Sequence, residues 1–319
     1  MSRVAAIDCG TNSIRLLIAD ISAGSFREID RRMEIVRLGQ GVDQNKSFHP
    51  DAIERTLAAV SDFAIEISRR GVSKVRFCAT SATRDASNRA IFIEGVKSIL
   101  GVEPEVISGE EEARLSFLGA TQELHDSESP FLVVDIGGGS TEFVFGARGV
   151  EAAKSVNIGC VRMSERHLTS QPPSKDQVAN AIIDIDRAIS DAATLVPLKA
   201  KTLVAVAGTA TTVAAAAMDL ETYDRYSIHL ARIPAPKVHE VSARFLTMSR
   251  EEIAALGYMH PGRVDVIAAG ALVLDRVMVA TGASEFVASE SDILDGIAWS
   301  RSEEHTSELQ SRFGISYAV

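Results

Sequence analysis

Two short glycine-rich segments carry residue types that bind phosphate, one near the amino terminus and one in the middle of the chain. Each has an apolar run, an aspartate, glycine and small polar residues in that order, and the two aspartates, Asp8 and Asp135, are 127 positions apart. Glycine lets backbone N–H groups approach a phosphate closely, and an aspartate at a strand end can hold a divalent cation or orient water. The repeat therefore predicts two lobes, each with one phosphate-binding loop.

The loop residues expected to contact phosphate are small or polar. In the first loop they are Gly10, Thr11, Asn12 and Ser13, and in the second they are Gly137, Gly138, Gly139, Ser140 and Thr141. Both loops lead into a strand-like run, 14–21 or 143–145, and not into a helix. A Rossmann dinucleotide site needs a loop that opens a helix, and a Walker A loop needs Gly-Lys-Ser/Thr. The pattern excludes both and predicts two tight β-hairpins.

Three adjacent carboxylates, Glu110, Glu111 and Glu112, stand at the start of an expected helix. Consecutive residues of a helix point about 100° apart, so at most one or two of them can face a common site. Ser108 and Glu111 match the Ser-x-x-Glu capping pattern, which makes Glu111 the cap. A capped, exposed turn stabilised by the helix dipole is the alternative explanation of the whole cluster.

Arg84 ends a polar loop, 80–84, which follows a buried strand expected at 75–79. A guanidinium group matches the geometry of phosphate oxygens, so Arg84 is a candidate phosphate ligand. An arginine solvated at a helix start is the alternative.

Alternating strand and helix patterns surround these residues. In the first half we expect strands at 4–8, 14–21, 26–38, 75–79 and 102–107, and helices at 50–70, 88–100 and 108–123. In the second half we expect strands at 131–135, 142–146, 201–207 and 285–288, and helices at 172–195, 210–218, 236–248, 250–256, 263–279 and 289–299.

The composition is that of a folded protein with more than one lobe. The 319 residues suffice for two lobes of about 150 residues, and 46% hydrophobic with 24% charged residues excludes global disorder. No apolar run is long enough to span a bilayer. The amino terminus lacks the features of a signal peptide, and Cys9, Cys78 and Cys160 lie too far apart for a zinc motif or a disulfide framework. We therefore expect a cytoplasmic protein.

The charge is acidic overall but unevenly distributed. A net charge of −10 argues against a nucleic-acid or membrane-surface protein. Residues 1–100 hold 15 lysines and arginines against 12 aspartates and glutamates, a net charge of +3. This mildly basic first third suits an anionic small ligand, although ordinary surface charge would also explain it.

Taken together, the motifs resemble the exopolyphosphatase/guanosine pentaphosphate phosphohydrolase family of the actin-like phosphotransferase superfold. The most telling segments are AAIDCGTNSIRLLI (5–18), ATSATRDASN (79–88), ISGEEEARLSFLG (107–119) and VVDIGGGSTEFVFG (133–146). The resemblance runs from about residue 4 to residue 296. It implies an α/β fold with two RNase H-like lobes around a cleft, and hydrolysis of a terminal phosphoanhydride with a divalent metal.

The resemblance also implies roles for single residues. Glu112, immediately before Ala113, corresponds to the general base that accepts a proton from the attacking water, and Arg84 is its partner in catalysis. Ser81 is implied as a further substrate contact. Gly208 and Thr209 occupy the third glycine turn, where kinases of the superfold hold adenosine, although Thr209 could equally be an N-cap.

The metal implied by the resemblance is Mg²⁺ or Mn²⁺. Asp135 and Glu142 flank one hairpin loop, so both can face its mouth, and Asp8 is the equivalent carboxylate of the first repeat. Two or three carboxylates without histidine are consistent with either metal. Arg263 and Asp265, which precede a long apolar stretch, are interpreted either as an ion pair or as substrate contacts.

The expected domains are a first lobe at 1–125 and a second lobe at 126–300, with the final helix near 289–300 able to pack back on the first. Residues 301–319 (RSEEHTSELQSRFGISYAV) lose the apolar periodicity and resemble translated adapter sequence, so we expect them to be non-native. The chain resembles the short two-domain form of the family, which favours short polyphosphate or a nucleotide over processive degradation of long chains.

The resulting functional hypothesis is release of the terminal phosphate of polyphosphate, of the 5′-γ-phosphate of guanosine pentaphosphate, or of both. The expected partner is this small anionic substrate, without nucleic acid or membrane, and a homodimer is left open. Two alternatives are an ATP-dependent kinase of the same superfold, using residues 208–212, and a non-catalytic nucleotide-dependent module of the chaperone or actin type.

Overall fold

The computed structural model describes residues 2–22, 25–72 and 74–301, and the chain divides into two compact units. The first unit contains residues up to 119 together with the segment from 293 onward, and the second contains 120–292. The first boundary thus lies ahead of the position expected between 125 and 126. The segment predicted to be non-native lies, apart from Arg301, outside the described residues.

The first unit is built on a five-stranded sheet in the order β3-β2-β1-β4-β5. Its strands are β1 (Ser2–Cys9), β2 (Ser13–Ser22), β3 (Ser25–Ile35), β4 (Lys74–Ala79) and β5 (Glu105–Val106). The first three strands run antiparallel as consecutive hairpins, and β4 pairs parallel to β1. A parallel partner requires a crossover connection, and the helix α2 (Pro50–Arg69) supplies it.

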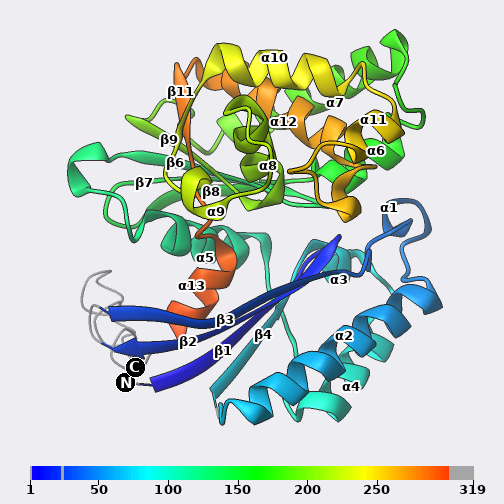
Figure 1. Cartoon of the computed structure of the whole chain (residues 1–319), viewed down its shortest axis with the longest axis vertical. Coiled ribbons are helices and arrows are strands. Elements are labelled where there is room, and N and C mark those ends of the chain that lie inside the picture. Colours follow the sequence, from blue (N-terminus) through cyan, green and yellow to red (C-terminus); the bar gives the residue numbers. More distant parts are fainter. Residues whose placement is uncertain (1, 23–24, 73, 302–319) are drawn as a thin grey trace. The chain divides into compact units, whose positions relative to one another are not determined.

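Alternating residues of these strands bury two different faces of the sheet. Ile14, Leu16 and Ile18 belong to a core with α2 and α4 (Arg89–Leu100). Leu17 and its neighbours of the opposite parity belong to a second core with α5 (Gly109–Thr121) and α13 (Ile293–Ser300). Two short helices, α1 (Val42–Asn45) and α3 (Ser81–Asp85), complete the unit. Helix α13, the last one in the described residues, therefore packs on the sheet that opens the chain (Figure 1).

The second unit repeats this plan in a six-stranded sheet of order β10-β11-β9-β6-β7-β8. Its strands are β6 (Phe131–Ile136), β7 (Thr141–Gly146), β8 (Val150–Val156), β9 (Thr202–Val206), β10 (Arg232–Pro234) and β11 (Glu285–Ala288). Strands β6, β7 and β8 are again antiparallel neighbours, and β9 lies parallel to β6 as β4 does to β1. The predicted α/β duplication is confirmed.

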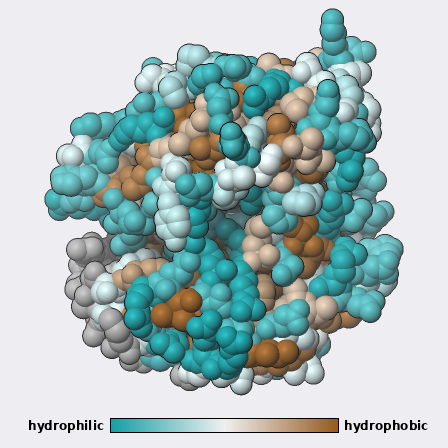
Figure 2. Space-filling model, viewed as in Figure 1, coloured by the Kyte–Doolittle hydropathy of each residue, from teal (hydrophilic) through white to brown (hydrophobic). Residues whose placement is uncertain are grey.

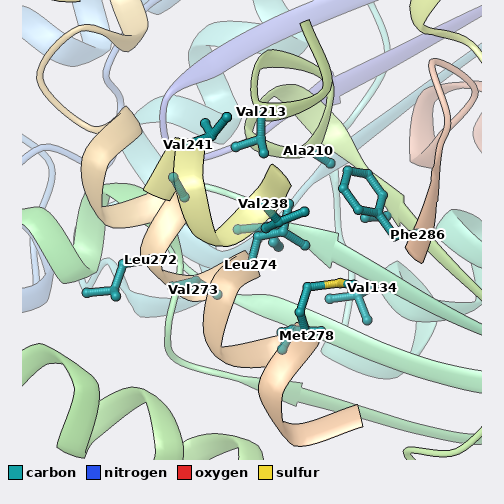
Figure 3. Packing of buried hydrophobic residues seen from close by; sticks show 14 of the residues in the cluster. Val134, Ala210, Val213, Val238, Val241, Leu272, Val273, Leu274, Met278 and Phe286 are labelled. Atoms are coloured by element: carbon teal, nitrogen blue, oxygen red, sulfur yellow. The ribbon is translucent and has the colours of Figure 1, made fainter. Parts of the chain in front are cut away.

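The helices of the second unit provide most of its apolar core. They are α6 (Cys160–Arg166), α7 (Lys175–Ala193), α8 (Ala207–Ala217), α9 (Arg225–Ile228), α10 (Ala235–Phe245), α11 (Arg250–Ala254) and α12 (Ile267–Thr281), with 3₁₀ turns at Asp126–Glu128 and Pro261–Arg263. Figure 3 shows Val238 of α10, Leu274 of α12 and Phe286 of β11 close together in this core. All three side chains are fully buried.

Several local predictions were wrong. The segment 80–84 is not a loop but runs into the helix α3, and β5 has two residues where 102–107 was expected. Helix α12 begins at Ile267 and not at 263, because Pro261 starts a separate 3₁₀ turn. Helix α13 begins at Ile293 and not at 289, because the Ser289 N–H bonds to the Ala205 carbonyl and keeps that segment against β9.

No helix in the described part of the chain is long and apolar enough to cross a membrane. The face shown in Figure 2 is largely hydrophilic, with small separate hydrophobic patches.

Packing of α7 gives a direct test of the second core. Ile185 is fully buried, whereas Ile183 on the same helix is 66% exposed. We expect Ile185→Ala to lower the free energy of unfolding by about 2–5 kcal/mol, because it removes buried methyl groups and leaves a cavity. Ile183→Ala is the matched control and should change it by less than about 0.5 kcal/mol. Urea denaturation measures both, and equal effects would contradict the described packing.

Candidate active site

The first glycine loop is a tight hairpin held in place by a second segment. The Gly10 N–H donates to the Ser13 carbonyl at 2.9 Å and closes the turn between β1 and β2. The Gly39 N–H donates to the Thr11 carbonyl at 2.8 Å, and the N–H groups of Val36 and Arg37 both donate to the Asn12 carbonyl. A Cβ at Gly39 would lie 2.3 Å from the Thr11 methyl group, so glycine is required there. The segment 36–39 therefore holds the loop by three backbone hydrogen bonds.

The second glycine loop has the same closing bond and a different support. The Gly137 N–H donates to the Ser140 carbonyl at 3.1 Å, as Gly10 does to Ser13. The helix α6 begins against this loop, where the N–H of Cys160 donates to the Gly137 carbonyl and Arg162 Nε donates to the Gly139 carbonyl at 2.7 Å. Both predicted hairpins are confirmed. In each, a neighbouring segment holds the loop by donating hydrogen bonds to its carbonyl groups.

Thr141 leaves this second loop and is locked to it. It is fully buried at the start of β7, and its hydroxyl donates to the Ile158 carbonyl at 3.0 Å. Gly138 is approached closely by Gly159, where a Cβ would lie 2.3 Å from the Gly138 carbonyl carbon. The backbone of this loop thus has no room to shift toward α6.

The buried Glu112 and the half-buried Arg84 form an ion pair in the first unit. Arg84 Nη1 donates to Glu112 Oε2 at 2.6 Å and to the Ile107 carbonyl at 3.0 Å. Glu112 is buried, whereas Glu110 is exposed and Glu111 is half-buried, with bonds to Arg76 and Arg114. The three glutamates therefore diverge as predicted, and only Glu112 points inward.

The strand ends explain why these residues meet. Cys9 pairs with Ala79 at the carboxyl ends of β1 and β4, the Thr80 N–H donates to the Cys9 carbonyl, and the Ile107 N–H donates to the Ala79 carbonyl. Parallel strands end at one edge of a sheet, where α/β proteins bind their ligands. Asp8, Arg84 and Glu112 consequently gather at this edge.

Burial raises the pKa of the Glu112 carboxyl above its ordinary value of 4.5, because desolvation penalises the ionised form. The Arg84 cation and a hydrogen bond from Thr80 oppose this rise in pKa, and the nearby Asp8 charge adds to it. Asp8 itself is the cross-strand neighbour of Arg15, whose Nη2 lies 2.6 Å from Asp8 Oδ2. Arg15 was not among the predicted residues, although counting back from the hairpin turn places it opposite Asp8.

Asp135 and Glu142 stand directly opposite each other on β6 and β7, so their side chains share one face of the sheet. Both are buried, and the Ser155 hydroxyl donates to Glu142 Oε1 at 2.6 Å. Two carboxylates on neighbouring strands fit Mg²⁺, which prefers oxygen ligands and keeps several waters. Within the described ranges, no group of three or more His, Cys, Asp or Glu residues forms a ready metal cage. Asp8 lies in the other unit, and its role toward a metal stays a prediction.

The third glycine turn differs from the expectation. Gly208 and Thr209 lie inside the first turn of α8, whose N-cap is Val206, so the N-cap interpretation of Thr209 was wrong. The Arg263 guanidinium covers Gly208, since a Cβ there would lie 2.3 Å from Arg263 Nη2.

Arg263 and Asp265 each contact a residue from another segment. Arg263 Nη1 donates to the Thr212 hydroxyl at 3.0 Å, and Arg250 Nε donates to Asp265 at 2.7 Å. Ser81, another predicted substrate contact, is buried as the first residue of α3 in the first unit. Its role stays a prediction.

Comparison with protein families gives a match over residues 17–305 to the Ppx/GppA phosphatase family. The chain belongs to this family. It is accordingly a phosphate-releasing hydrolase, and the resemblance found in the motifs is confirmed.

Several relatives match over nearly their whole length. Exopolyphosphatase 2 of Mycobacterium tuberculosis is 47% identical over 314 residues, which cover 94% of this chain and 98% of the relative. The crystal structure of an exopolyphosphatase-like protein superposes with a TM-score of 0.90 at 44% identity, covering 93% of this chain and 96% of that one. The Ppx/GppA enzyme of Aquifex aeolicus gives a TM-score of 0.78 at 30% identity, covering 93% and 98%.

The raised pKa of Glu112 predicts a pH-dependent stability difference. When a carboxyl has a higher pKa in the folded protein than in the unfolded chain, its protonation stabilises the fold at low pH. The protein loses this stability as the pH rises from the unfolded-state pKa through the folded-state pKa. We expect wild type to lose stability relative to Glu112→Gln as pH rises above 4.5. Urea denaturation at a series of pH values measures this difference. The exposed Glu110→Gln is the control and should follow wild type, and a constant difference between Glu112→Gln and wild type would contradict the described burial.

Proposed function

We propose that this chain releases the terminal phosphate of inorganic polyphosphate, with Glu112 as the general base for the attacking water. The observation that carries the proposal is the buried Glu112 carboxylate and its bond to Arg84 at the carboxyl edge of the first sheet. A carboxylate with a raised pKa accepts a proton more readily near neutral pH than an ordinary one. The near full-length match to an exopolyphosphatase supports this substrate class.

Guanosine pentaphosphate is a second candidate substrate. A guanosine-5′-triphosphate,3′-diphosphate pyrophosphatase of Pseudoalteromonas atlantica is 36% identical over 189 residues, which cover 59% of this chain and 37% of the relative. Both candidates end in the same phosphoanhydride, so one set of residues serves either. Family membership supports hydrolysis over the kinase and the non-catalytic alternatives.

Arg84 serves both the base and the phosphate in this proposal. Its Nη1 atom orients Glu112 and is itself held by the Ile107 carbonyl. The fork of a guanidinium leaves further N–H donors for a phosphate oxygen. A fixed cation beside the reacting group stabilises the negative charge that the phosphoryl oxygens carry in the transition state.

The hairpin loops provide neutral donors. The supporting segments donate hydrogen bonds to the carbonyl groups of each loop and so hold its backbone in place. Glycine, which has no side chain, lets a phosphate come close to the N–H groups of the loop. Preorganised donors need no rearrangement when they meet a phosphate. The N–H groups of Gly10 and Gly137 already close their turns, so in this proposal the donors to phosphate are those of Thr11 to Ser13 in the first unit and of Gly138 to Thr141 in the second.

Asp135 and Glu142 are the proposed ligands of Mg²⁺ or Mn²⁺. A bound divalent cation would neutralise charge on the phosphate oxygens. The Ser155 hydroxyl holds one oxygen of Glu142 in place, which fixes the orientation of that carboxylate.

Replacing the base tests the proposal directly. We expect Glu112→Gln to lower kcat by at least about a hundredfold, because the amide cannot accept the proton of the attacking water. Glu110→Gln, two residues earlier on the same helix and exposed, should keep wild-type kcat. Phosphate release from polyphosphate and from guanosine pentaphosphate is compared for all three proteins. Full activity of Glu112→Gln would refute its role, and a wild type inactive on both substrates would refute the proposed function.

Replacing the second unit's carboxylates tests the metal site. We expect Asp135→Asn and Glu142→Gln each to raise the Mg²⁺ concentration for half-maximal activity by about tenfold or more, because each removes a charged oxygen ligand. Calorimetric titration of Mn²⁺ into the substrate-free protein gives a second readout. Glu151→Gln, exposed on β8, is the control. Unchanged metal affinity in both carboxylate variants would place the metal elsewhere.

A further inference from the structure

An extended network of arginines covers the end of the first sheet that lies away from the candidate active site. Its five arginines are Arg3, Arg27, Arg32, Arg69 and Arg70. Its three carboxylates are Asp20, Asp30 and Glu66. We call these eight residues the arginine network.

The strand register places the network on one face of the sheet. Arg3 pairs with Asp20 across β1 and β2, and Asp20 pairs with Arg27 across β2 and β3, so the three side chains form a row. A register shift at Ile18/Ala19 then brings Asp30 and Arg32 of β3 to the same face. Without this irregularity, alternation along β3 would turn them to the other face.

The carboxyl end of α2 closes the network. Arg32 lies 2.9 Å from Glu66 and 3.0 Å from Asp30. Arg70 lies 2.8 Å from Glu66, and its carbonyl accepts a hydrogen bond from Arg3 Nη1 at 3.2 Å. The row across the strands and the helix end therefore form one continuous surface.

Charge is layered within this surface. The carboxylates lie beneath, with side-chain exposures of 8% for Asp20 and 5% for Glu66, and the arginines lie above them. Arg3 and Arg27 together lower the pKa of Asp20 far below its ordinary value, so this carboxylate stays ionised. Five guanidinium groups over three carboxylates leave an excess of two positive charges.

Two of the five arginines are not required to neutralise the buried carboxylates. Asp20 keeps a bidentate bond to Arg3 without Arg27, and Glu66 keeps Arg32 and Arg70 without Arg69. Arg27 and Arg69 are also the most exposed members, at 63% and 69%. Among the described residues, each has one carboxylate partner, and Arg69 is 3.7 Å from its own. These two cations are available to a ligand at little structural cost.

We propose that the arginine network is a second binding site for polyphosphate, which holds the body of a long chain away from the reacting end. This proposal rests on the proposed function. A linear polyanion is the ligand that a continuous row of guanidinium groups fits, because each fork can bind phosphate oxygens along the chain. The network begins at Arg3, about 16 Å along β1 from Asp8 at the rise of a strand, so it is separate from the catalytic residues.

The double variant Arg27→Gln/Arg69→Gln tests the site. We expect its KM for long-chain polyphosphate to rise about tenfold. The slope of log KM against the logarithm of the salt concentration should become smaller by about 1.4, because two phosphate contacts are lost. Its kcat, and its KM for tripolyphosphate and guanosine pentaphosphate, should equal those of wild type, because a short substrate cannot reach both sites. The matched control is Lys97→Gln/Lys237→Gln, which removes two exposed cations that are each paired with one glutamate elsewhere.

A binding measurement separates this site from catalysis. Long-chain polyphosphate is titrated into Glu112→Gln protein with and without the two arginine substitutions, and we expect the same tenfold weakening. An equal KM and affinity in the arginine and control variants would overturn the second site, whereas a wild type that cleaves no substrate would overturn only the proposed function. An oligonucleotide that binds the network more tightly than polyphosphate would assign the surface to nucleic acid and refute the proposal.

Discussion

The burial of one carboxylate, Glu112, sets the requirements for the first unit. An ionised group removed from water is costly unless a partner of opposite charge and further hydrogen bonds accompany it. Arg84 supplies the charge, and the Ile107 carbonyl holds Arg84 in turn. This arrangement requires that β1 and β4 end, and α5 begin, at the same edge of the sheet. The hydrogen bonds from the N–H groups of Thr80 and Ile107 to the carbonyls at the strand ends hold them there.

The two units use the same hairpin and stabilise it by different means. Gly10 and Gly137 make equivalent closing bonds to Ser13 and Ser140. In the first unit the segment around Gly39 supports the loop, whereas in the second the start of α6 does so. The duplication therefore preserves the closing turn and the aspartate before it. The surrounding chain is free to differ, provided that the loop carbonyls are occupied.

An acidic protein can bind an anionic substrate if its positive charge is concentrated where the ligand lies. The net charge of −10 is an average over the chain, and it falls on many exposed carboxylates. In the first unit arginine is placed either singly, as Arg84 beside its glutamate, or in layers, as in the arginine network. Both arrangements bury the carboxylate beneath a more exposed guanidinium, and in the arginine network the local charge is positive although the overall charge is negative.

The sequence by itself determined the duplicated hairpins and the α/β class, because strand alternation is a local property. Helical rotation showed only that the three glutamates must diverge, and the choice of Glu112 among them came from the family resemblance. Local pattern also located α2 within a residue or two. It did not reveal the Asp8–Arg15 pair, the helix over 81–85, or Arg263 against Gly208. The Asp8–Arg15 pair follows from the register of the first hairpin, whereas packing between distant segments decides the contact of Arg263 with Gly208. The row from Arg3 to Arg27 likewise exists only once three strands are aligned and one bulge resets their alternation.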